Sequence, residues 1–273
     1  MPTQKKYSII ASDFDDTLLR SDDTISDFTR RTISDFTSRG GTFLISTGRM
    51  YRSALAQAKD LGLTGYLISY QGGMVNDIES GEQLLHRPMS TEDALFNLKL
   101  MEEGGSGQIH VYNDDILYVK TRTEYTAMYE RACGVTAVET HAALQEVVKE
   151  QAFTPTKLMM MDYPERCRAL VDKLEVLYGD RYYYCLSKPT FFEVALKGVS
   201  KGSAVEYVAG LLGKTLGDVI AIGDSLNDLP MIQAAGLGVA VGNALEDVKA
   251  AADLVGKTND EDAVADIILR YGI

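Results

Sequence analysis

The chain has 273 residues, enough for one large domain or two smaller ones, because domains typically contain about 100 to 200 residues. Its hydrophobic fraction of 45% and charged fraction of 24% are those of a globular protein and exclude a disordered or fibrous chain. The formal net charge of -12 argues against nucleic acid and anionic membranes as partners, since both require a basic footprint. A small anionic substrate remains compatible with this charge where positive side chains gather locally.

The first third of the sequence alternates short apolar runs with helical patterns. We expect strands at residues 7–12, 42–46 and 66–69, and helices at residues 26–39 and 50–61. Ser26 is a candidate N-cap of the first helix, and Gly40-Gly41 is a candidate stop. The order strand, helix, strand predicts a parallel sheet.

The last third repeats this rhythm, and the middle third differs from it. In the last third we expect helices at 200–212 and 226–235, strands at 219–222 and 237–241, and two further helical patterns. In the middle we expect strands at 108–112, 116–120 and 157–161, and helices beginning near Ser90 and Pro164. Asn113-Asp114-Asp115 predicts a hairpin, and hence antiparallel pairing.

These patterns predict an α/β fold in which one domain interrupts another. The predicted core is a Rossmann-like, doubly wound parallel sheet formed by residues 1–87 and 190–273. Residues 88–189 are predicted to form an inserted α+β cap domain. Three distant cysteines and the lack of an apolar leader or membrane-spanning run lead us to expect free thiols and a soluble, cytoplasmic protein, monomeric or weakly self-associating.

Four polar clusters follow predicted strands or open a helix. They are Asp13-Phe-Asp15-Asp16-Thr17, Ser46-Thr47-Gly48-Arg49, Gly198-Val-Ser200-Lys201-Gly202 and Gly223-Asp224-Ser225-Leu-Asn227-Asp228. In an open parallel sheet, loops at the carboxyl ends of the strands surround the ligand crevice, so these clusters share a predicted location.

The first cluster places Asp13 and Asp15 two residues apart, so in an extended segment their side chains point the same way and repel. A hard cation between them removes this repulsion, and Mg²⁺ prefers such oxygen ligands together with a substrate phosphate. Asp224 follows another strand of the same sheet and could supply a further carboxylate.

Lys201 directly follows the candidate N-cap Ser200, where the helix dipole disfavours a cation unless an anion lies nearby. Helix N-termini with glycine-rich entries bind phosphate through free N–H groups, so Lys201 suggests a phosphate site. Thr47 and Gly48 offer hydroxyl and backbone donors on a tight turn.

Each cluster also has a purely structural alternative. The aspartates are compatible with a solvated turn or a helix cap, and Lys201 with an exposed surface lysine. The three histidines, His86, His110 and His141, are scattered and fit surface or packing positions, and the Tyr182-Tyr183-Tyr184 run fits a packed strand.

Taken in order, DFDDTLL, STGR, GVSKG and GDSLNDLPM resemble the four motifs of the haloacid dehalogenase (HAD) superfamily. The resemblance is to its Cof-type phosphatases, which have a large α/β cap (C2B-like) between the second and third motifs. It covers both outer thirds of the chain. It implies a Mg²⁺-dependent phosphatase that hydrolyses small phosphorylated metabolites such as sugar phosphates through an aspartyl-phosphate, with the cap governing substrate choice.

Carried over by residue, the resemblance implies that Asp13 is the nucleophile and Asp15 the general acid and base. The implied phosphate ligands are Thr47, Gly48, Lys201 and Asn227. The implied Mg²⁺ ligands are Asp13, Asp15 through its backbone carbonyl, and Asp224, with Ser225 and Asp228 supporting them or binding weakly. Asp16 stands where the superfamily most often has glycine, and we expect a helix-capping or supporting role for it.

Several other classes of protein share parts of this pattern. A phospho-accepting signalling receiver domain also combines aspartates with Lys and Thr around magnesium, but it is about half this length and lacks the inserted domain. A dehalogenase would not be expected to keep Asp15, and a silent scaffold would not be expected to keep all four clusters. A phosphomutase, or a phosphatase acting on lipids or proteins, stays open.

Overall fold

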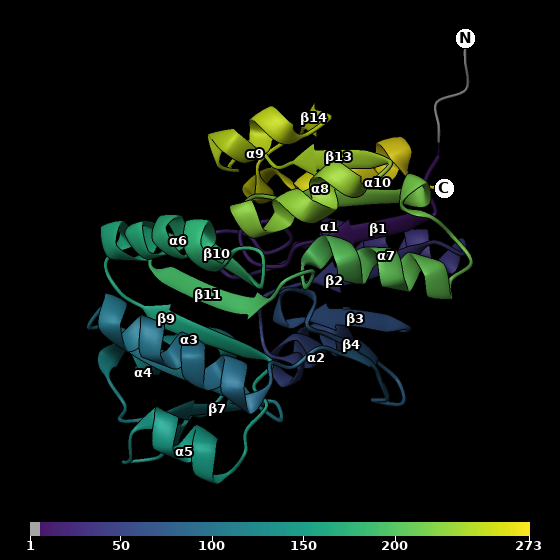
Figure 1. The fold of residues 1–273 in the computed structure, drawn as a ribbon. Coiled ribbons are helices and arrows are strands. Elements are labelled where there is room, and N and C mark those ends of the chain that lie inside the picture. Colours follow the sequence, from purple (N-terminus) through teal and green to yellow (C-terminus); the bar gives the residue numbers. More distant parts are fainter. Residues whose placement is uncertain (1–5) are drawn as a thin grey trace. The chain divides into compact units, whose positions relative to one another are not determined.

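The computed structural model describes residues 6–273, and in it the chain forms two compact units (Figure 1). The first unit contains the chain up to Gly48 together with Ala54–Leu84 and Ser200–Ile273. The second contains Arg49–Ser53 and Leu85–Val199. The second unit is therefore inserted into the sequence of the first.

Within residues 6–273, the first unit has a sheet of eight strands in the order β14-β13-β12-β1-β2-β3-β4-β5. The strands are β1 (Ile9–Ser12), β2 (Thr42–Ser46), β3 (Tyr66–Ser69), β4 (Met74–Asp77), β5 (Gln83–His86), β12 (Val219–Gly223), β13 (Leu237–Ala240) and β14 (Leu254–Val255). The six strands from β14 to β3 pair in parallel, whereas β4 runs antiparallel to β3. The predicted parallel core is confirmed.

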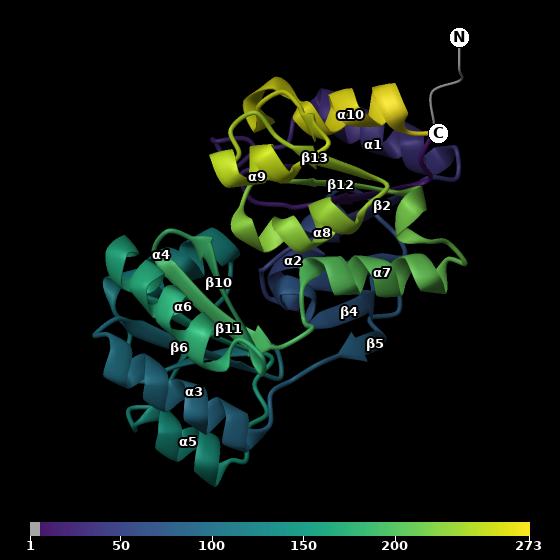
Figure 2. The ribbon, with the colours of Figure 1, turned by 45° about the horizontal axis from the view of Figure 1, so that its top comes forward.

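Helices cover both faces of this sheet. They are α1 (Asp27–Ser38), α2 (Tyr51–Asp60), α7 (Lys201–Leu211), α8 (Leu229–Ala234), α9 (Glu246–Ala251) and α10 (Ala263–Tyr271), with 3₁₀ turns η1 (Tyr70–Gly72), η2 (Leu216–Asp218), η3 (Leu226–Asp228) and η4 (Asn259–Glu261). Figure 2 shows α1 and α10 over one face, and α7 and α8 over the other. Ser26 caps α1 as predicted, since its side chain accepts a hydrogen bond from the Thr29 N–H at 3.0 Å.

The winding of the chain reverses beside β1. From β1 the chain passes through α1 to β2 on one side, and from β12 it passes through α8 to β13 on the other. The carboxyl ends of β1 and β12 therefore flank a topological switch point, which is where open α/β sheets bind their ligands. This places the segments after β1, β2 and β12 at one edge of the sheet.

In the second unit, residues 85–199 form a sheet in the order β10-β11-β9-β6-β7-β8. Its strands are β6 (Gln108–Asn113), β7 (Ile116–Val119), β8 (Val138–Glu139), β9 (Lys157–Met161), β10 (Tyr182–Lys188) and β11 (Phe191–Leu196), and its helices are α3 (Thr91–Gly104), α4 (Glu124–Cys133), α5 (Leu144–Glu150) and α6 (Pro164–Tyr178). The pairing is antiparallel except between β7 and β8. The core of this unit packs Leu98 of α3, Val148 of α5 and Leu170 of α6 against Met160 and Phe192 of the sheet.

The predicted hairpin is present between β6 and β7. Asp114 and Asp115 connect the two strands with φ values of 51° and 56°, the left-handed pair that a two-residue hairpin turn of type I′ requires. The Tyr182–Tyr184 run lies in β10, as the packed-strand interpretation predicted.

The predicted boundary of the inserted segment needs correction at its C-terminal end. Residues 190–199 were assigned to the core, but β11 pairs with β9 and β10 and so belongs to the sheet of the second unit. The first unit resumes at Ser200. The strands β4, β5, β8, β11 and β14 and the helices α4 and α5 were not predicted.

Two further observations concern the whole described chain. Cys133, Cys167 and Cys185 are free thiols. Between residues 6 and 273, every helix is too short or too polar to cross a membrane.

Candidate active site

Lys201 is fully buried and its ammonium group joins two carboxylates. It is the first residue of α7, behind the N-cap Ser200, whose hydroxyl accepts a hydrogen bond from the Ser203 N–H at 3.2 Å. Lys201 Nζ donates to Asp13 Oδ1 at 2.5 Å and to Asp228 Oδ1 at 2.6 Å. The exposed-lysine alternative is therefore excluded, because the side chain has 0% exposure.

The carboxylates of Asp13 and Asp228 meet here because β1 and β12, which precede them, end at the same edge of the sheet. Asp13 directly follows β1, and its N–H donates to the Ile222 carbonyl of β12 at 2.9 Å. Asp228 ends η3, and its Oδ2 accepts from the N–H groups of Asp224 and Ser225, each at 3.0 Å. The loop after β12 is thus folded around Asp228 so that its other oxygen faces Lys201.

Asp224 adds a third carboxylate, held by a residue of the first cluster. Thr17 Oγ1 donates to Asp224 Oδ1 at 2.9 Å, which connects the loop after β1 to the loop after β12. The segments that carry Asp13 and Asp224 are separated by about 210 residues in sequence and meet through their strands, which pair in parallel register.

Burial and mutual repulsion control the charges of the cluster. Burial, with the charge of Asp228 next in size, holds the pKa of Asp13 well above its usual range. Burial and the same Asp228 charge raise the pKa of Asp224 to about 7. Burial alone would lower the pKa of Lys201, but the carboxylates of Asp13 and Asp228 outweigh it and raise the pKa, so this ammonium stays charged.

The acidic cluster has the composition of a site for a hard divalent cation. The described residues Asp13, Asp224 and Asp228 each offer an oxygen, and these three atoms lie within 4.8 Å of one another. With Lys201 included, the formal charge of the four side chains is -3 + 1 = -2, which one divalent cation balances. Oxygen donors and this charge fit Mg²⁺.

The predicted ligands and this cluster overlap without being identical. Asp13 and Asp224 belong to both, whereas Asp228, expected in a supporting role, is a full member of the carboxylate cluster. Asp15 contributes no side chain to the cluster, and its backbone carbonyl as a ligand stays a prediction. Ser225 takes part through its N–H to Asp228, in a supporting position.

Thr47, Gly48 and Asn227 meet around a residue that sequence reasoning missed. Thr47 is buried, and its carbonyl accepts from the Gln71 N–H at 3.0 Å. Asn227 Nδ2 donates to Gln71 Oε1 at 2.9 Å. Gln71 lies just after β3, so the rule that selected the other clusters, a polar residue behind a parallel strand, also applied to it.

Asp16 takes a left-handed backbone conformation that glycine adopts more easily. Its φ is 54°, a left-handed value that costs little for glycine and is tolerated by Asp and Asn. Its carbonyl accepts from Asn243 Nδ2 at 2.7 Å. Of the two expected roles, helix capping is excluded because the first helix within residues 6–273 begins at Asp27, and the supporting role stays a prediction.

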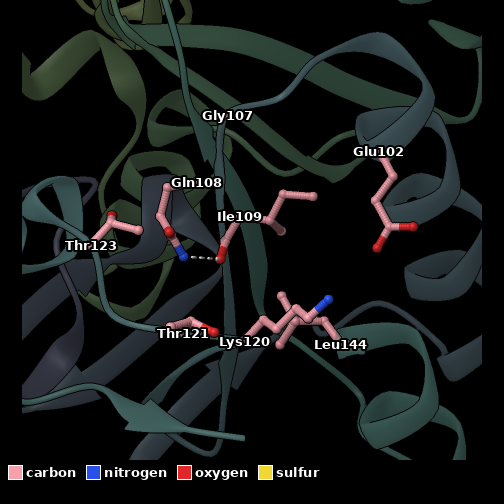
Figure 3. Close-up of a pocket in the computed structure, with 8 residues that line it drawn as sticks. All are labelled: Glu102, Gly107, Gln108, Ile109, Lys120, Thr121, Thr123 and Leu144. Atoms are coloured by element: carbon pink, nitrogen blue, oxygen red, sulfur yellow. Dashed lines mark hydrogen bonds between the residues drawn. The ribbon is translucent and has the colours of Figure 1, made fainter. Parts of the chain in front are cut away.

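The second unit contains a separate pocket of about 310 Å³ (Figure 3). It lies between the end of α3, the strands β6 and β7 and the start of α5, and it is lined by Glu102, Gly107, Gln108, Ile109, Lys120, Thr121, Thr123 and Leu144. Its lining holds one acidic and one basic side chain and no group of carboxylates. The phosphoryl chemistry predicted from the motifs therefore has its counterpart in the first unit.

A buried lysine and three carboxylates at the switch point of a doubly wound sheet have the location and composition of an α/β enzyme site. The sequence profile of the haloacid dehalogenase-like hydrolases matches residues 10–268. The chain therefore belongs to this family, as its motifs predicted.

Relatives that match over nearly the whole chain include named phosphatases. A putative phosphatase of Haemophilus influenzae is 32% identical, covering 96% of this chain and 97% of the relative. The 5-amino-6-(5-phospho-D-ribitylamino)uracil phosphatase of Bacillus subtilis is 31% identical over 96% of this chain and 95% of its own. A solved haloacid dehalogenase-like hydrolase from B. subtilis superposes with a TM-score of 0.86 at 26% identity, covering 96% and 99% of the two chains. The protein is a phosphatase of this family.

Proposed function

We propose that the protein is a Mg²⁺-dependent phosphatase that hydrolyses small phosphorylated metabolites, with sugar phosphates as the favoured class, through an aspartyl-phosphate on Asp13. The observation that carries the proposal is the fully buried Lys201, which joins Asp13 to Asp228 beside Asp224. A carboxylate held beside a fixed ammonium is oriented for attack on phosphorus, and the ammonium can neutralise charge on the transferred group.

Each residue has a proposed task in two half-reactions. In the first, an Asp13 oxygen forms a bond to phosphorus while the bond from phosphorus to the leaving oxygen breaks and Asp15 gives that oxygen a proton. In the second, Asp15 removes a proton from water, whose oxygen attacks phosphorus and displaces Asp13. Lys201, Asn227, Thr47 and the Gly48 N–H hold the phosphoryl oxygens.

The proposed cation site uses the carboxylates of Asp13 and Asp224, with Asp228 close to both and Asp15 contributing its carbonyl. A bound Mg²⁺ would supply positive charge to the phosphoryl group and orient it. Without that charge the site carries a formal -2, which repels a phosphate dianion.

The proposal of small substrates rests on the overall charge and on the relatives. The net charge of -12 disfavours nucleic acid, and the B. subtilis relative is a phosphatase of a small phosphorylated ribityl compound. The chain enters the second unit after Leu84 and re-enters the first unit at Ser200, immediately before Lys201. We propose that this inserted unit acts as the cap that governs substrate choice.

The test is release of orthophosphate from a panel of phosphorylated metabolites and from an aryl phosphate, with and without Mg²⁺, expressed as kcat/KM. Asp13→Asn should abolish turnover, and Asp15→Asn should slow both half-reactions by about 10²- to 10⁴-fold. Asp23→Asn is the matched control, because Asp23 is exposed and its φ of 61° suits asparagine equally well.

Each alternative predicts a different result. Full activity of the Asp13→Asn variant would refute the nucleophile assignment. Isomerised substrate without orthophosphate release would indicate a phosphomutase, and a stable phosphorylated Asp13 without turnover would indicate a signalling domain. Strong turnover of a phosphoprotein with none of small esters would overturn the proposed substrate class.

A further inference from the structure

The turn after β3 has an unusual backbone for residues that carry side chains. Tyr70, Gln71 and Gly72 have consecutive φ values of 53°, 58° and 93°. Tyr70 and Gln71 are 1% and 2% exposed. Left-handed conformations are unfavourable for such residues, so the surrounding contacts must hold this turn in place.

Those contacts reach three of the four motif segments. The Gln71 N–H donates to the Thr47 carbonyl at 3.0 Å, and a Cβ placed on Gly48 would lie 2.3 Å from Gln71 Nε2. A Cβ placed on Gly72 would lie 2.1 Å from the Ser200 carbonyl oxygen, at the start of the helix that carries Lys201. The third contact is the hydrogen bond from Asn227 to Gln71 Oε1.

The hydrogen bond to Gln71 determines how the Asn227 amide is turned. Asn227 is 5% exposed, and its Oδ1 has no hydrogen-bond partner among the described residues. The terminal torsion of an asparagine side chain is broad, so burial alone leaves its amide free to rotate. With one Nδ2–H donated to Gln71 Oε1, the second Nδ2–H has a defined direction.

We propose that Gln71 is a positioning residue of the phosphoryl site, which fixes the direction of the Asn227 amide. The inference rests on the proposed function, in which Asn227, Thr47 and Gly48 bind phosphoryl oxygens. A side chain at position 48 would force the Gln71 amide to move, because a Cβ there would lie 2.3 Å from Gln71 Nε2. Donors that are already oriented bind a phosphoryl group without first being ordered.

The experiment is a double-mutant cycle of wild type, Gln71→Ala, Asn227→Ala and the double variant. KM and kcat are measured on p-nitrophenyl phosphate with Mg²⁺, and the dissociation constant of inorganic phosphate is measured by calorimetry. Loss of one oriented hydrogen bond should raise KM and the phosphate dissociation constant about 10-fold in Gln71→Ala. Because Gln71 acts through Asn227, it should change neither quantity more than about twofold when Asn227 is already alanine.

A structural effect would look different. Gln71→Gly also removes the amide but relieves the left-handed backbone, so it should match Gln71→Ala in phosphate affinity even if its melting temperature is higher. A fall in melting temperature with unchanged phosphate affinity would overturn the inference, as would an equal loss in both Asn227 backgrounds.

Failure of the proposed function would appear in measurements on the wild-type protein and on Asp13→Asn. Wild-type protein that binds phosphate but turns over no ester refutes the proposed hydrolysis, while the calorimetric cycle still decides on Gln71. Wild-type activity that Asp13→Asn abolishes, together with an unaffected Gln71→Ala variant, refutes the inference alone. Wild-type protein that binds no phosphate refutes both.

Discussion

Replacing Lys201 by methionine tests the buried charge arrangement directly. The side chain has 0% exposure and contacts both Asp13 and Asp228, so Lys201→Met keeps most of the volume and removes only the ammonium. Two carboxylates then face each other without a counter-charge in a buried site. Removing one partner of a buried ion pair typically costs about 3–5 kcal/mol, and we expect a loss of that size in the free energy of unfolding.

Urea unfolding followed by circular dichroism at pH 7 in EDTA measures this loss. Two comparisons separate the charge effect from other effects of the substitution. Lys201→Met combined with Asp228→Asn should recover part of the stability, because only Asp13 is then left unpaired. Lys214→Met removes an exposed lysine just after α7 and should change stability by no more than about 0.5 kcal/mol.

A loss below about 1 kcal/mol in Lys201→Met would refute the reasoning, since that is the range of solvent-exposed ion pairs. It would mean that solvent or proton uptake compensates the carboxylates, and that Lys201 does not hold Asp13 in position. Activity should fall together with stability, because the same ammonium is proposed to face the phosphoryl group.

Two further predictions concern backbone geometry and pH. Gly72→Ala places a Cβ 2.1 Å from the Ser200 carbonyl oxygen at a φ of 93°, so urea melts should show a loss of at least about 2 kcal/mol. Gly210→Ala in α7 meets open space and should gain about 0.5–1 kcal/mol, and equal effects at the two glycines would contradict the geometry. Burial, with the charge of Lys157, lowers the pKa of His110 to about 3, so the unfolded chain takes up a proton below pH 6.5 that the folded chain does not. The free energy of unfolding should therefore decrease by about 2 kcal/mol as the pH is lowered from 7 to 5. The His110→Phe variant should lack this decrease. An equal decrease in the two proteins would disprove the role of His110.

Many helices and strands of the first unit could be predicted, because apolar runs and capping residues lie within the elements that they mark. The bounds of β2 and β3 agree with the prediction, since each is a short apolar run between polar residues. The N-caps Ser26 and Ser200 were also recognisable, because capping depends on residues within one turn. Lys201 was found through its conflict with the helix dipole, which only a nearby anion resolves.

Long-range pairing set the limit of prediction. Lys157 and Glu193 form a buried ion pair at 3.1 Å in the second unit, yet the sequence around Lys157 reads as an ordinary apolar strand. Strands β9 and β11 bring the two together across 36 positions. Gln71 follows a parallel strand as the other clusters do, but its pairing with Asn227, 156 positions away, has no local signal.

Asp13, Asp15 and Asp16, which follow β1, show that long-range pairing also limits prediction of the site. From spacing alone, Asp13 and Asp15 were expected to face the same way and repel, but Asp13 is buried, Asp15 is partly exposed and Asp16 is exposed. The repulsion that raises the pKa of Asp13 comes mainly from Asp228, more than 200 positions away, with Asp15 contributing least. Repulsion between Asp13 and Asp15 is present but small, and the positive partner beside Asp13 is Lys201. The sequence motif shows that carboxylates are present, whereas the pairing of β1 with β12 decides which of them share one site.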